Sequence, residues 1–485
     1  MARKNETDVR PLRANDITRW DDTADVIIVG SGCAGTSASL GALEAGADVL
    51  VLEAGGGLGG TSIVSSGQIY LGGGTPIQRA CGFEDSAEEM FKYLMASCGP
   101  EPDADLIGPF CEESASHFDW LVAQGVPFKE SFFAGAHEPI GDDCLIYSGS
   151  EHLPPYCDVA RPAPRGHSPQ VAGPKGPLLM AKLLAAADAA GQRATLNARC
   201  ERLIVESDGS IAGVSASIEG TTRAFRAKGG VVLASGGFIF NDTMLERYAP
   251  RLTRCLKLGA GRDDGSGIQM GMAAGGDAIR MESGDVSLTI FPPTPIWSGL
   301  VFDGRGTRCL NETSYIGTFG EECVLRQDGK LFLLLDEATL EDPSAFGGQF
   351  AAVGADIAEV ERELSLPSGS LQRSVALYND YAAAGVDPMF HKAASYLKPL
   401  TNPPYAVIDL SVEAVHYAAL TLGGLHIDPR GHVLDHTSQP IPGLFAAGRT
   451  TSGVGKQGYS SGISIADGTF FGRRAGQTAA ARQGR

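Results

Sequence analysis

A glycine-rich turn near the start of the chain has the spacing of a dinucleotide-binding site. Gly30, Gly32 and Gly35 form a GxGxxG pattern between an apolar run and a run of small residues. In such a turn the first glycine permits the tight bend, the second lets backbone approach a pyrophosphate, and the third allows close helix–strand packing. The N–H groups and positive dipole at a helix start attract phosphate. The pattern therefore predicts pyrophosphate binding, although glycines alone can also mark a simple turn.

An acidic residue follows at the distance that ribose recognition requires. Residues 26–29 predict a buried strand, 34–45 a helix ended by Gly46, and 48–52 a second strand that leads to Glu53. A carboxylate at this position can accept hydrogen bonds from both ribose hydroxyls. The complete strand–helix–strand unit therefore favours a dinucleotide site over a simple turn.

Two more glycine clusters favour FAD over NAD. Residues 59–62 read Gly-Gly-Thr-Ser, and residues 444–449 read Leu-Phe-Ala-Ala-Gly-Arg near the C-terminus. NAD needs only the first unit, whereas a large isoalloxazine ring needs backbone from distant segments to enclose it. We therefore predict FAD as the cofactor.

The pattern of elements predicts an α/β protein with an interrupted domain. Further helices are expected at 86–97, 104–124, 177–190 and from about 462, and strands from 194, at 229–237 and around a hairpin at 429–431. Composition turns aromatic and proline-rich at about 280 and returns to the glycine-rich style after 418. We predict a Rossmann-like FAD-binding domain with a central parallel sheet, formed by residues 23–280 and 419–485. A smaller α+β substrate-capping domain at 281–418 interrupts it, and residues 1–22 are an N-terminal tail.

Composition excludes several classes of protein. The 485 residues carry a net charge of −18, which argues against nucleic acid or an anionic membrane surface as a partner. The longest apolar runs are far shorter than the roughly 20 residues of a transmembrane helix. The ten cysteines include no CxxC pair, so neither a metal site nor a disulfide framework is expected, and His426, His432 and His436 around a hairpin are disfavoured as ligands. A cytoplasmic location is the resulting expectation.

The ordered motifs resemble those of the succinate dehydrogenase/fumarate reductase flavoprotein superfamily. They are GSGCAG (30–35), Glu53, GGTS (59–62), VVLASGG (231–237), GRDDGSGI (261–268), GGLHID (423–428) and LFAAGR (444–449). The resemblance implies an FAD domain interrupted by a mobile cap. Covalent attachment in relatives uses a histidine near the glycine cluster, and none lies between residues 53 and 116, so FAD is expected to be non-covalent. The residues expected against FAD are Gly30, Ser31, Gly32, Ala34, Gly35, Glu53, Ala54, Gly60, Thr61, Ser62, Ser66, Gly67, Ala234, Ser235, Gly236, Asp264, Gly448, Arg449, Gly462, Ser464 and Ile465.

The groups typical of fumarate reductases in this superfamily are missing. Those enzymes share an arginine proton donor soon after an R-F-x-N-E segment and a histidine just before T-x-G-G. Here residues 308–312 read Arg-Cys-Leu-Asn-Glu and no arginine follows until Arg326, while residues 418–420, before Thr421, are Ala, Ala and Leu. Fumarate reduction is therefore not expected.

The C-terminal string at 458–464, Gly-Tyr-Ser-Ser-Gly-Ile-Ser, resembles the bacterial 3-ketosteroid dehydrogenases, and the Δ4-(5α) type most closely. The Δ1 type has a Tyr-Pro-Gly-Pro-Gly-like string there. The resemblance implies catalytic roles for Tyr315, Tyr459 and Ser461. Its implied reaction places a C4–C5 double bond in a 3-keto-5α-steroid.

These hydroxyls suit desaturation of a ketone, which requires loss of an α-proton and a β-hydride. A tyrosine hydroxyl at the carbonyl oxygen stabilises the developing enolate, and flavin takes the hydride. By intrinsic pKa a tyrosine is a better base than serine, whereas the resemblance gives proton abstraction to Ser461 and the relay to Tyr315. Which of the two is the primary base stays open.

Two other functions remain as alternatives. One is another flavoenzyme of the superfamily, such as a Δ1-dehydrogenase or a reductase of enones or unsaturated acids. The other is a flavin-binding electron-transfer subunit. No motif specifies the electron acceptor or the oligomeric state, and the lack of a second dinucleotide motif argues against direct reoxidation by NAD(P).

Overall fold

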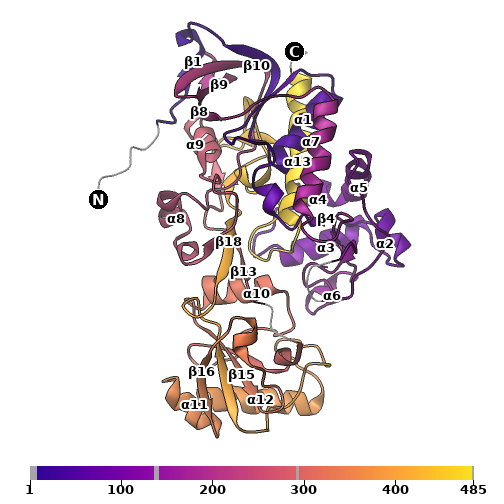
Figure 1. Cartoon of the computed structure of the whole chain (residues 1–485), viewed down its shortest axis with the longest axis vertical. Coiled ribbons are helices and arrows are strands. Elements are labelled where there is room, and N and C mark those ends of the chain that lie inside the picture. Colours follow the sequence, from indigo (N-terminus) through magenta and orange to yellow (C-terminus); the bar gives the residue numbers. More distant parts are fainter. Residues whose placement is uncertain (1–7, 136–140, 291–293, 483–485) are drawn as a thin grey trace.

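The largest sheet contains both strands of the predicted strand–helix–strand unit. The computed structural model describes residues 8–135, 141–290 and 294–482, and within them this sheet has nine strands (Figure 1). Their main order is β1 (Leu12–Arg13), β8 (Ala198–Val205), β9 (Ile211–Ile218), β10 (Thr221–Leu233), β2 (Asp22–Val29), β3 (Val49–Leu52) and β7 (Arg193–Thr195), with β21 (Pro440–Ala446) on β10 and β20 (His432–Leu434) on β21.

The sheet is mixed, with the parallel part where the glycine turn lies. Strands β21, β10, β2, β3 and β7 are joined by parallel pairing, whereas β8, β9 and the first half of β10 form an antiparallel meander. Val29 pairs with both Leu52 and Leu233. The carboxyl ends of β2, β3 and β10 therefore meet at one edge, where open α/β sheets bind their ligands.

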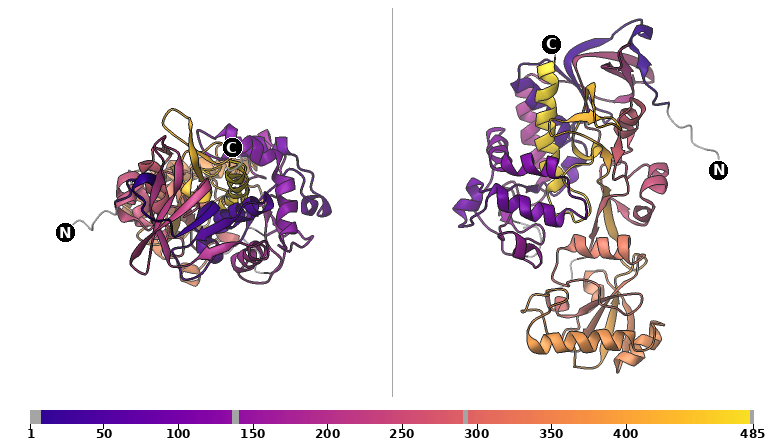
Figure 2. Two further views of the ribbon diagram at one scale, coloured as in Figure 1. Left: turned by 90° about the horizontal axis from the view of Figure 1, so that it is seen from above. Right: turned by 180° about the vertical axis from the view of Figure 1, so that it is seen from behind.

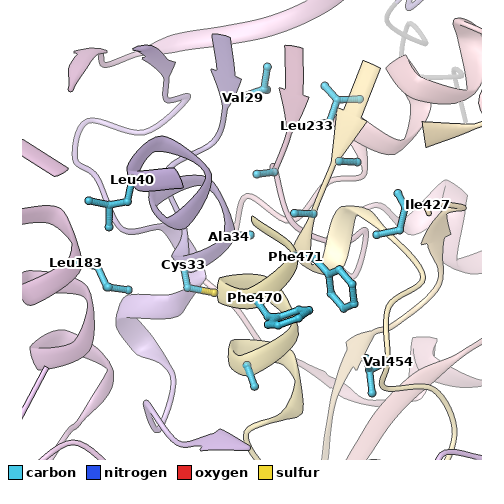
Figure 3. Close-up of a cluster of buried hydrophobic side chains, with 14 of the residues drawn as sticks. Val29, Cys33, Ala34, Leu40, Leu183, Leu233, Ile427, Val454, Phe470 and Phe471 are labelled. Atoms are coloured by element: carbon cyan, nitrogen blue, oxygen red, sulfur yellow. The ribbon is translucent and has the colours of Figure 1, made fainter. Parts of the chain in front are cut away.

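Two helices beside this sheet pack against each other at very close distance. α1 (Cys33–Glu44) follows the glycine turn, and α13 (Ile463–Arg482) returns from the far end of the chain to pack along it. A Cβ on Gly476 would lie 1.9 Å from the carbonyl oxygen of Ala38, so only glycine allows this approach. Figure 3 shows Phe470 and Phe471 of α13 beside Cys33 and Ala34 of α1 in the buried core.

Helices cover the side of the molecule beyond α13 (Figure 1). They are α2 (Pro76–Ala80), α3 (Ala87–Ser97), α4 (Ala104–Glu112), α5 (Ser114–Ala123), α6 (Tyr156–Val159) and, against α1, α7 (Gly176–Ala189). The expectation of one helix at 104–124 is wrong, because the backbone breaks at Glu113 (φ −102°, ψ 5°). The break places the buried Ser114 hydroxyl where it accepts a hydrogen bond from the Gly72 N–H at 2.8 Å.

A second, four-stranded sheet lies at the opposite end of the molecule (Figures 1 and 2). It is antiparallel, in the order β14 (Leu300–Asp303), β15 (Leu331–Asp336), β17 (Tyr405–Asp409) and β16 (Phe350–Gly354), with α11 (Ile357–Glu363) and α12 (Ser370–Ala384) beside it. The chain enters this part through β13 (Gly284–Leu288) and leaves it through β18 (Tyr417–Thr421), and these two strands pair with each other. α10 (Ile316–Gly320) and the π-helical segment Glu321–Arg326 pack against β13.

The remaining elements are short. They are β4 (Ile69–Tyr70), β5 (Leu145–Ile146), β6 (Gly166–His167), α8 (Asp242–Tyr248), β11 (Leu256–Lys257), α9 (Ser266–Ala273), β12 (Ala278–Ile279) and β19 (Gly424–Leu425). In the part expected to be a tail, Leu12 and Arg13 pair with β8, and Leu12 and Trp20 pack on a small buried cluster. None of the helices in the described ranges is long and apolar enough to cross a membrane.

Candidate active site

One large cavity of about 1010 Å³ opens where β2, β3 and β10 end. It is large even among ligand pockets, which span roughly 300–1,000 Å³. Its wall starts at the Gly30 turn, passes the glycine cluster at 60–62 and ends at Tyr315 and Leu420, near the strand pair β13–β18. The cavity therefore joins the predicted nucleotide site to the segment expected to act on the substrate.

Nearly all residues expected to bind FAD line this cavity. Gly35 lies outside the wall, since its Cβ would meet the carbonyl oxygen of Gly30 at 2.0 Å and its role is packing. Gly67, with φ +70°, also lies outside and packs against the backbone between Lys175 and Gly176. The lining positions are Gly30, Ser31, Gly32, Ala34, Glu53, Ala54, Gly60, Thr61, Ser62, Ser66, Ala234, Ser235, Gly236, Asp264, Gly448, Arg449, Gly462, Ser464 and Ile465.

Glu53 is fixed at the end of β3 by the turn itself. Its Oε2 accepts hydrogen bonds from the Ser31 N–H at 3.0 Å and the Ser31 hydroxyl at 2.6 Å, and its Oε1 accepts one from the Gly55 N–H at 2.6 Å. The side chain is 7% exposed and lines the cavity. A carboxylate has about four lone-pair sites, so one stays available for a ribose hydroxyl.

Asp263 joins three glycine-rich segments at the same end, and sequence reasoning missed it in favour of its neighbour Asp264. Its Oδ2 accepts hydrogen bonds from the Thr61 hydroxyl at 2.7 Å and from Arg449 Nη2 at 3.1 Å. Asp264 also lines the cavity but pairs with Arg199 at 2.6 Å. Both acids belong to one Asp-Asp pair, and sequence alone does not tell which one turns toward Thr61.

Unpaired polar atoms along the wall fit a bound flavin nucleotide. Arg449 Nη1 and Ser464 Oγ are buried and have no hydrogen-bond partner among the described residues. Both side chains line the cavity, and buried donors without partners are costly unless a ligand or water satisfies them. At Gly32 a Cβ would project to 3.4 Å from Ser62 Oγ, so glycine keeps this part of the wall open. The unpaired donors and the open turn are compatible with a bound FAD.

The three hydroxyls of the expected catalytic site also meet in this cavity. Tyr315 and Ser461 line it, together with Tyr459, and all three are half-buried. Tyr459 Oη accepts a hydrogen bond from the Ser464 N–H at 3.0 Å, at the start of α13. Burial, reinforced by the nearby Asp285, raises the pKa of Tyr459. Tyr459 therefore keeps its proton and can donate it to a substrate oxygen.

The sequence analysis missed one acid, Asp285, which lines the cavity together with the three hydroxyls. Asp285 on β13 is 5% exposed and lines the cavity. Burial, together with the like charge of Glu321, raises its pKa to about 7. The signal that could have found it is an acid between the apolar residues of a short strand, since such a residue is rarely buried without a reason.

The basic residues of the loop 161–167 anchor the structure rather than line the site. Arg165 is fully buried and forms a two-pronged pair with Asp85 at 3.0 and 2.7 Å. His167 Nε2 lies 2.9 Å from the Thr75 hydroxyl. At the hairpin, His432 pairs with Asp428 at 2.8 Å. The described residues contain no group of three or more His, Cys, Asp or Glu that could hold a metal ion.

Comparison with known proteins agrees with this geometry. The FAD binding domain family matches residues 25–465. The chain is 28% identical to the 3-oxo-5-alpha-steroid 4-dehydrogenase of Comamonas testosteroni, over 91% of this chain and 95% of that protein. It is 29% identical to the urocanate reductase of Eggerthella lenta, over 94% of this chain and 74% of that protein.

Comparison with solved structures identifies the family more specifically. The 3-ketosteroid-Δ4-(5α)-dehydrogenase of Rhodococcus jostii, solved with 4-androstene-3,17-dione, is 42% identical, with a TM-score of 0.91 over 97% of this chain and 100% of that one. The 3-ketosteroid Δ1-dehydrogenase of Sterolibacterium denitrificans shares the fold, with 21% identity and a TM-score of 0.72 over 95% and 100% of the two chains. The predicted α/β fold, FAD binding and family are confirmed: the chain belongs to the 3-ketosteroid Δ4-(5α)-dehydrogenases of the FAD-binding succinate dehydrogenase/fumarate reductase superfamily.

Proposed function

We propose that this protein oxidises 3-keto-5α-steroids, forming the C4–C5 double bond with FAD as the hydride acceptor. The observation that carries the proposal is the single cavity that joins the FAD-binding turn to Tyr315, Tyr459 and Ser461. Its Rhodococcus relative, solved with 4-androstene-3,17-dione, supports a steroid of this class. Bound FAD supplies the acceptor for the β-hydride.

The hydroxyls of Tyr459, Ser461 and Tyr315 have different roles in the oxidation of the ketone. Tyr459, held by the Ser464 N–H, donates its proton toward the C3 carbonyl oxygen and stabilises the enolate that forms as the α-proton leaves. Ser461 and Tyr315 take the proton away from the α-carbon. Ser461 is positioned by its backbone N–H, which donates to the Ser148 carbonyl at 2.8 Å.

The charge of the wall argues against an unsaturated acid as substrate. The acid Asp285 lies at the hydroxyl end, with Glu321 behind it. Two of the arginines of the wall, Arg199 and Arg449, are already paired with acids of the FAD-binding segments. A carboxylate substrate would meet like charge where a neutral ketone does not.

We also propose which segments of the chain bind FAD and which cap the substrate. Residues 23–280 with 419–485 hold FAD, and residues 281–418 cap the substrate. The paired strands β13 and β18, with Asp285 opposite Leu420, support this division, because they place entry and exit of the cap beside the cavity. FAD is held non-covalently: burial raises the pKa of the Cys33 thiol in the wall and so keeps it protonated and unreactive.

Anaerobic mixing with 5α-androstane-3,17-dione tests the function. We expect bleaching of the flavin absorbance in a stopped-flow trace, and 4-androstene-3,17-dione as the product by mass spectrometry. The matched control is the same skeleton with a 3α-hydroxyl, which lacks the acidified α-proton and should leave the flavin oxidised. No bleaching by the ketone, with rapid reoxidation of the reduced enzyme by urocanate or fumarate, would favour the reductase alternative.

A further inference from the structure

Asp285 faces the cavity from a strand whose other side is core. In β13, Val286 and Leu288 are fully or almost fully buried in a hydrophobic cluster, whereas Asp285 and Ser287 line the cavity. Side chains alternate across a strand, so this register turns both polar residues to one face. Asp285 pairs with Leu420 of β18, which contributes no polar group.

The carboxyl group of Asp285 is poorly satisfied by its surroundings. Its Oδ1 is buried without a hydrogen-bond partner in the described part of the chain, and its Oδ2 accepts only a long bond from the Ser287 hydroxyl at 3.5 Å. Among the described residues, the charged group that acts on it is Glu321, which repels its negative form. A buried acid of this kind costs stability because hydrogen bonds and opposite charges do not compensate its burial, which makes it a candidate for a functional role.

Asp285 lies near the ring of Tyr315 and acts electrostatically on Tyr459. A Cβ placed on Gly317 would lie 3.6 Å from Asp285 Oδ1 and 2.6 Å from Tyr315 Cε1, so the two side chains approach the same point. Its charge also raises the pKa of Tyr459. The titratable and polar groups that face it are therefore Ser287 on its own strand, Glu321 on the π-helical segment, Tyr315 before α10 and Tyr459 before α13.

We propose that the carboxylate of Asp285 is the acceptor of the substrate α-proton, which reaches it through the hydroxyl of Tyr315. This proposal rests on the proposed function. As the α-C–H bond breaks, its electron pair forms the enolate, and the enolate becomes the C4–C5 double bond with a restored carbonyl as the β-hydride leaves with its own pair, for which bound FAD would be the acceptor. The Tyr315 hydroxyl gains one proton and passes one to Oδ1, so Asp285 ends neutral and the tyrosine unchanged.

A relay made only of hydroxyl groups has no member that can keep the proton. Neither serine nor tyrosine holds an extra proton at neutral pH, because their conjugate acids are far too strong. A relay of hydroxyls therefore needs a final base. A carboxyl whose pKa lies at about 7 is half ionised at neutral pH and suits proton acceptance.

The first test is the pH profile of Asp285→Asn, which keeps the shape but accepts no proton. In the wild type, kcat/KM should fall below pH about 7, because only the ionised acid accepts the proton. This fall at low pH is the acid limb of the profile. In Asp285→Asn, kcat/KM should fall by about 10²–10³, within the range of general-base catalysis, and the acid limb should disappear. Glu282→Gln is the matched control: this exposed acid lies three residues away and should leave rate and limb unchanged.

A second readout does not depend on turnover. Infrared difference spectra of wild type minus Asp285→Asn should contain one carboxylic C=O band that disappears as pH rises through about 7. If Asp285→Asn fails to retain FAD, Asp285→Glu takes its place and should keep the acid limb at a reduced rate.

The proposal is overturned if Asp285→Asn keeps the acid limb and a rate within threefold of wild type. It is also overturned if Asp285→Glu loses the limb, or if no carboxyl band titrates near pH 7. These outcomes leave the proposed function intact as long as the wild type oxidises the saturated ketone. A wild type that is inert toward every 3-keto-5α-steroid refutes the function and this inference together.

Discussion

The carboxylate of Glu321 accepts a hydrogen bond from the backbone N–H of Gly458, 137 residues further along the chain. The bond ties the π-helical segment Glu321–Arg326 to the loop that presents Tyr459. Glu321 also repels the negative form of Asp285 and raises its pKa. Glu321 therefore holds the loop that carries Tyr459, the proposed enolate-stabilising residue, and also raises the proton affinity of Asp285.

Glu321→Gln should separate these two effects. The amide keeps an oxygen for the Gly458 N–H but removes the charge, so the pKa of Asp285 should fall. We expect the acid limb of kcat/KM to move to lower pH with little change in the plateau. Glu322→Gln makes the same charge change one residue away, where the carboxylate accepts from Arg326 at 3.2 Å, and should leave the limb in place. A limb that stays at its wild-type pH in Glu321→Gln contradicts the electrostatic coupling.

Glu53→Gln should weaken FAD retention while the fold persists. Glu53 accepts three hydrogen bonds from Ser31 and Gly55, and a neutral amide loses the charge-assisted bonds to the turn and to ribose, worth roughly 1.5–3 kcal/mol each. We expect FAD to be lost about 10–100-fold more readily, measured by flavin absorbance after dialysis. Full retention of FAD would show that Glu53 does not hold the ribose.

Local patterns predicted the strand–helix–strand unit well. The strand–helix–strand unit ending at Glu53 depends on sequence neighbours, since a strand, a glycine turn and a helix follow one another in about 30 residues. The same holds for the start of α1, predicted at residue 34 and found at Cys33. The candidate hydroxyls were identified by resemblance, because Tyr315 and Tyr459 are far apart in sequence and line one cavity only in the folded chain.

Residues whose role depends on distant packing escaped prediction. Alternation in β13 indicates that Asp285 and Ser287 share a face, but not that this face meets the cavity. Likewise, nothing near Glu321 in sequence indicates that its carboxylate reaches Gly458. The break at Glu113 within the predicted helix 104–124 likewise goes with a distant contact, between Ser114 and Gly72.

The buried acid Asp285 should make the free energy of unfolding depend on pH. The pKa of Asp285 is raised from 3.8 to about 7 on folding, so its contribution is fully present below pH 3.8 and is lost as pH rises through 7. Asp285→Asn removes this loss. We expect its melting temperature relative to wild type to rise between pH 5 and pH 8, by a free-energy change on the order of 2–3 kcal/mol. Scanning calorimetry at the two pH values measures it, and a constant difference argues against an ionised Asp285.

Tyr459→Phe should damage turnover far more than folding. The ring stays in place, and the Ser464 N–H loses its acceptor, so a small fall in melting temperature is expected with full flavin content. Turnover of a 3-keto-5α-steroid should fall by about 10²–10³, as for loss of one oxyanion donor. Near-wild-type turnover in steady-state assays would exclude the enolate-stabilising role.

Tyr315→Phe and Ser461→Ala should behave as one unit. Each removes one hydroxyl that takes part in moving the α-proton, so each should lower kcat by a similar factor, and the combined variant should be scarcely worse than either alone. Independent roles would instead make the two losses multiply. Single-turnover flavin bleaching measures the step directly, because product release does not contribute to it. The acid limb near pH 7 should survive in Ser461→Ala, where Tyr315 still faces Asp285, and vanish in Tyr315→Phe, where the acid is cut off from the substrate. The reverse result would make Ser461, not Tyr315, the neighbour of Asp285 in the path of the proton.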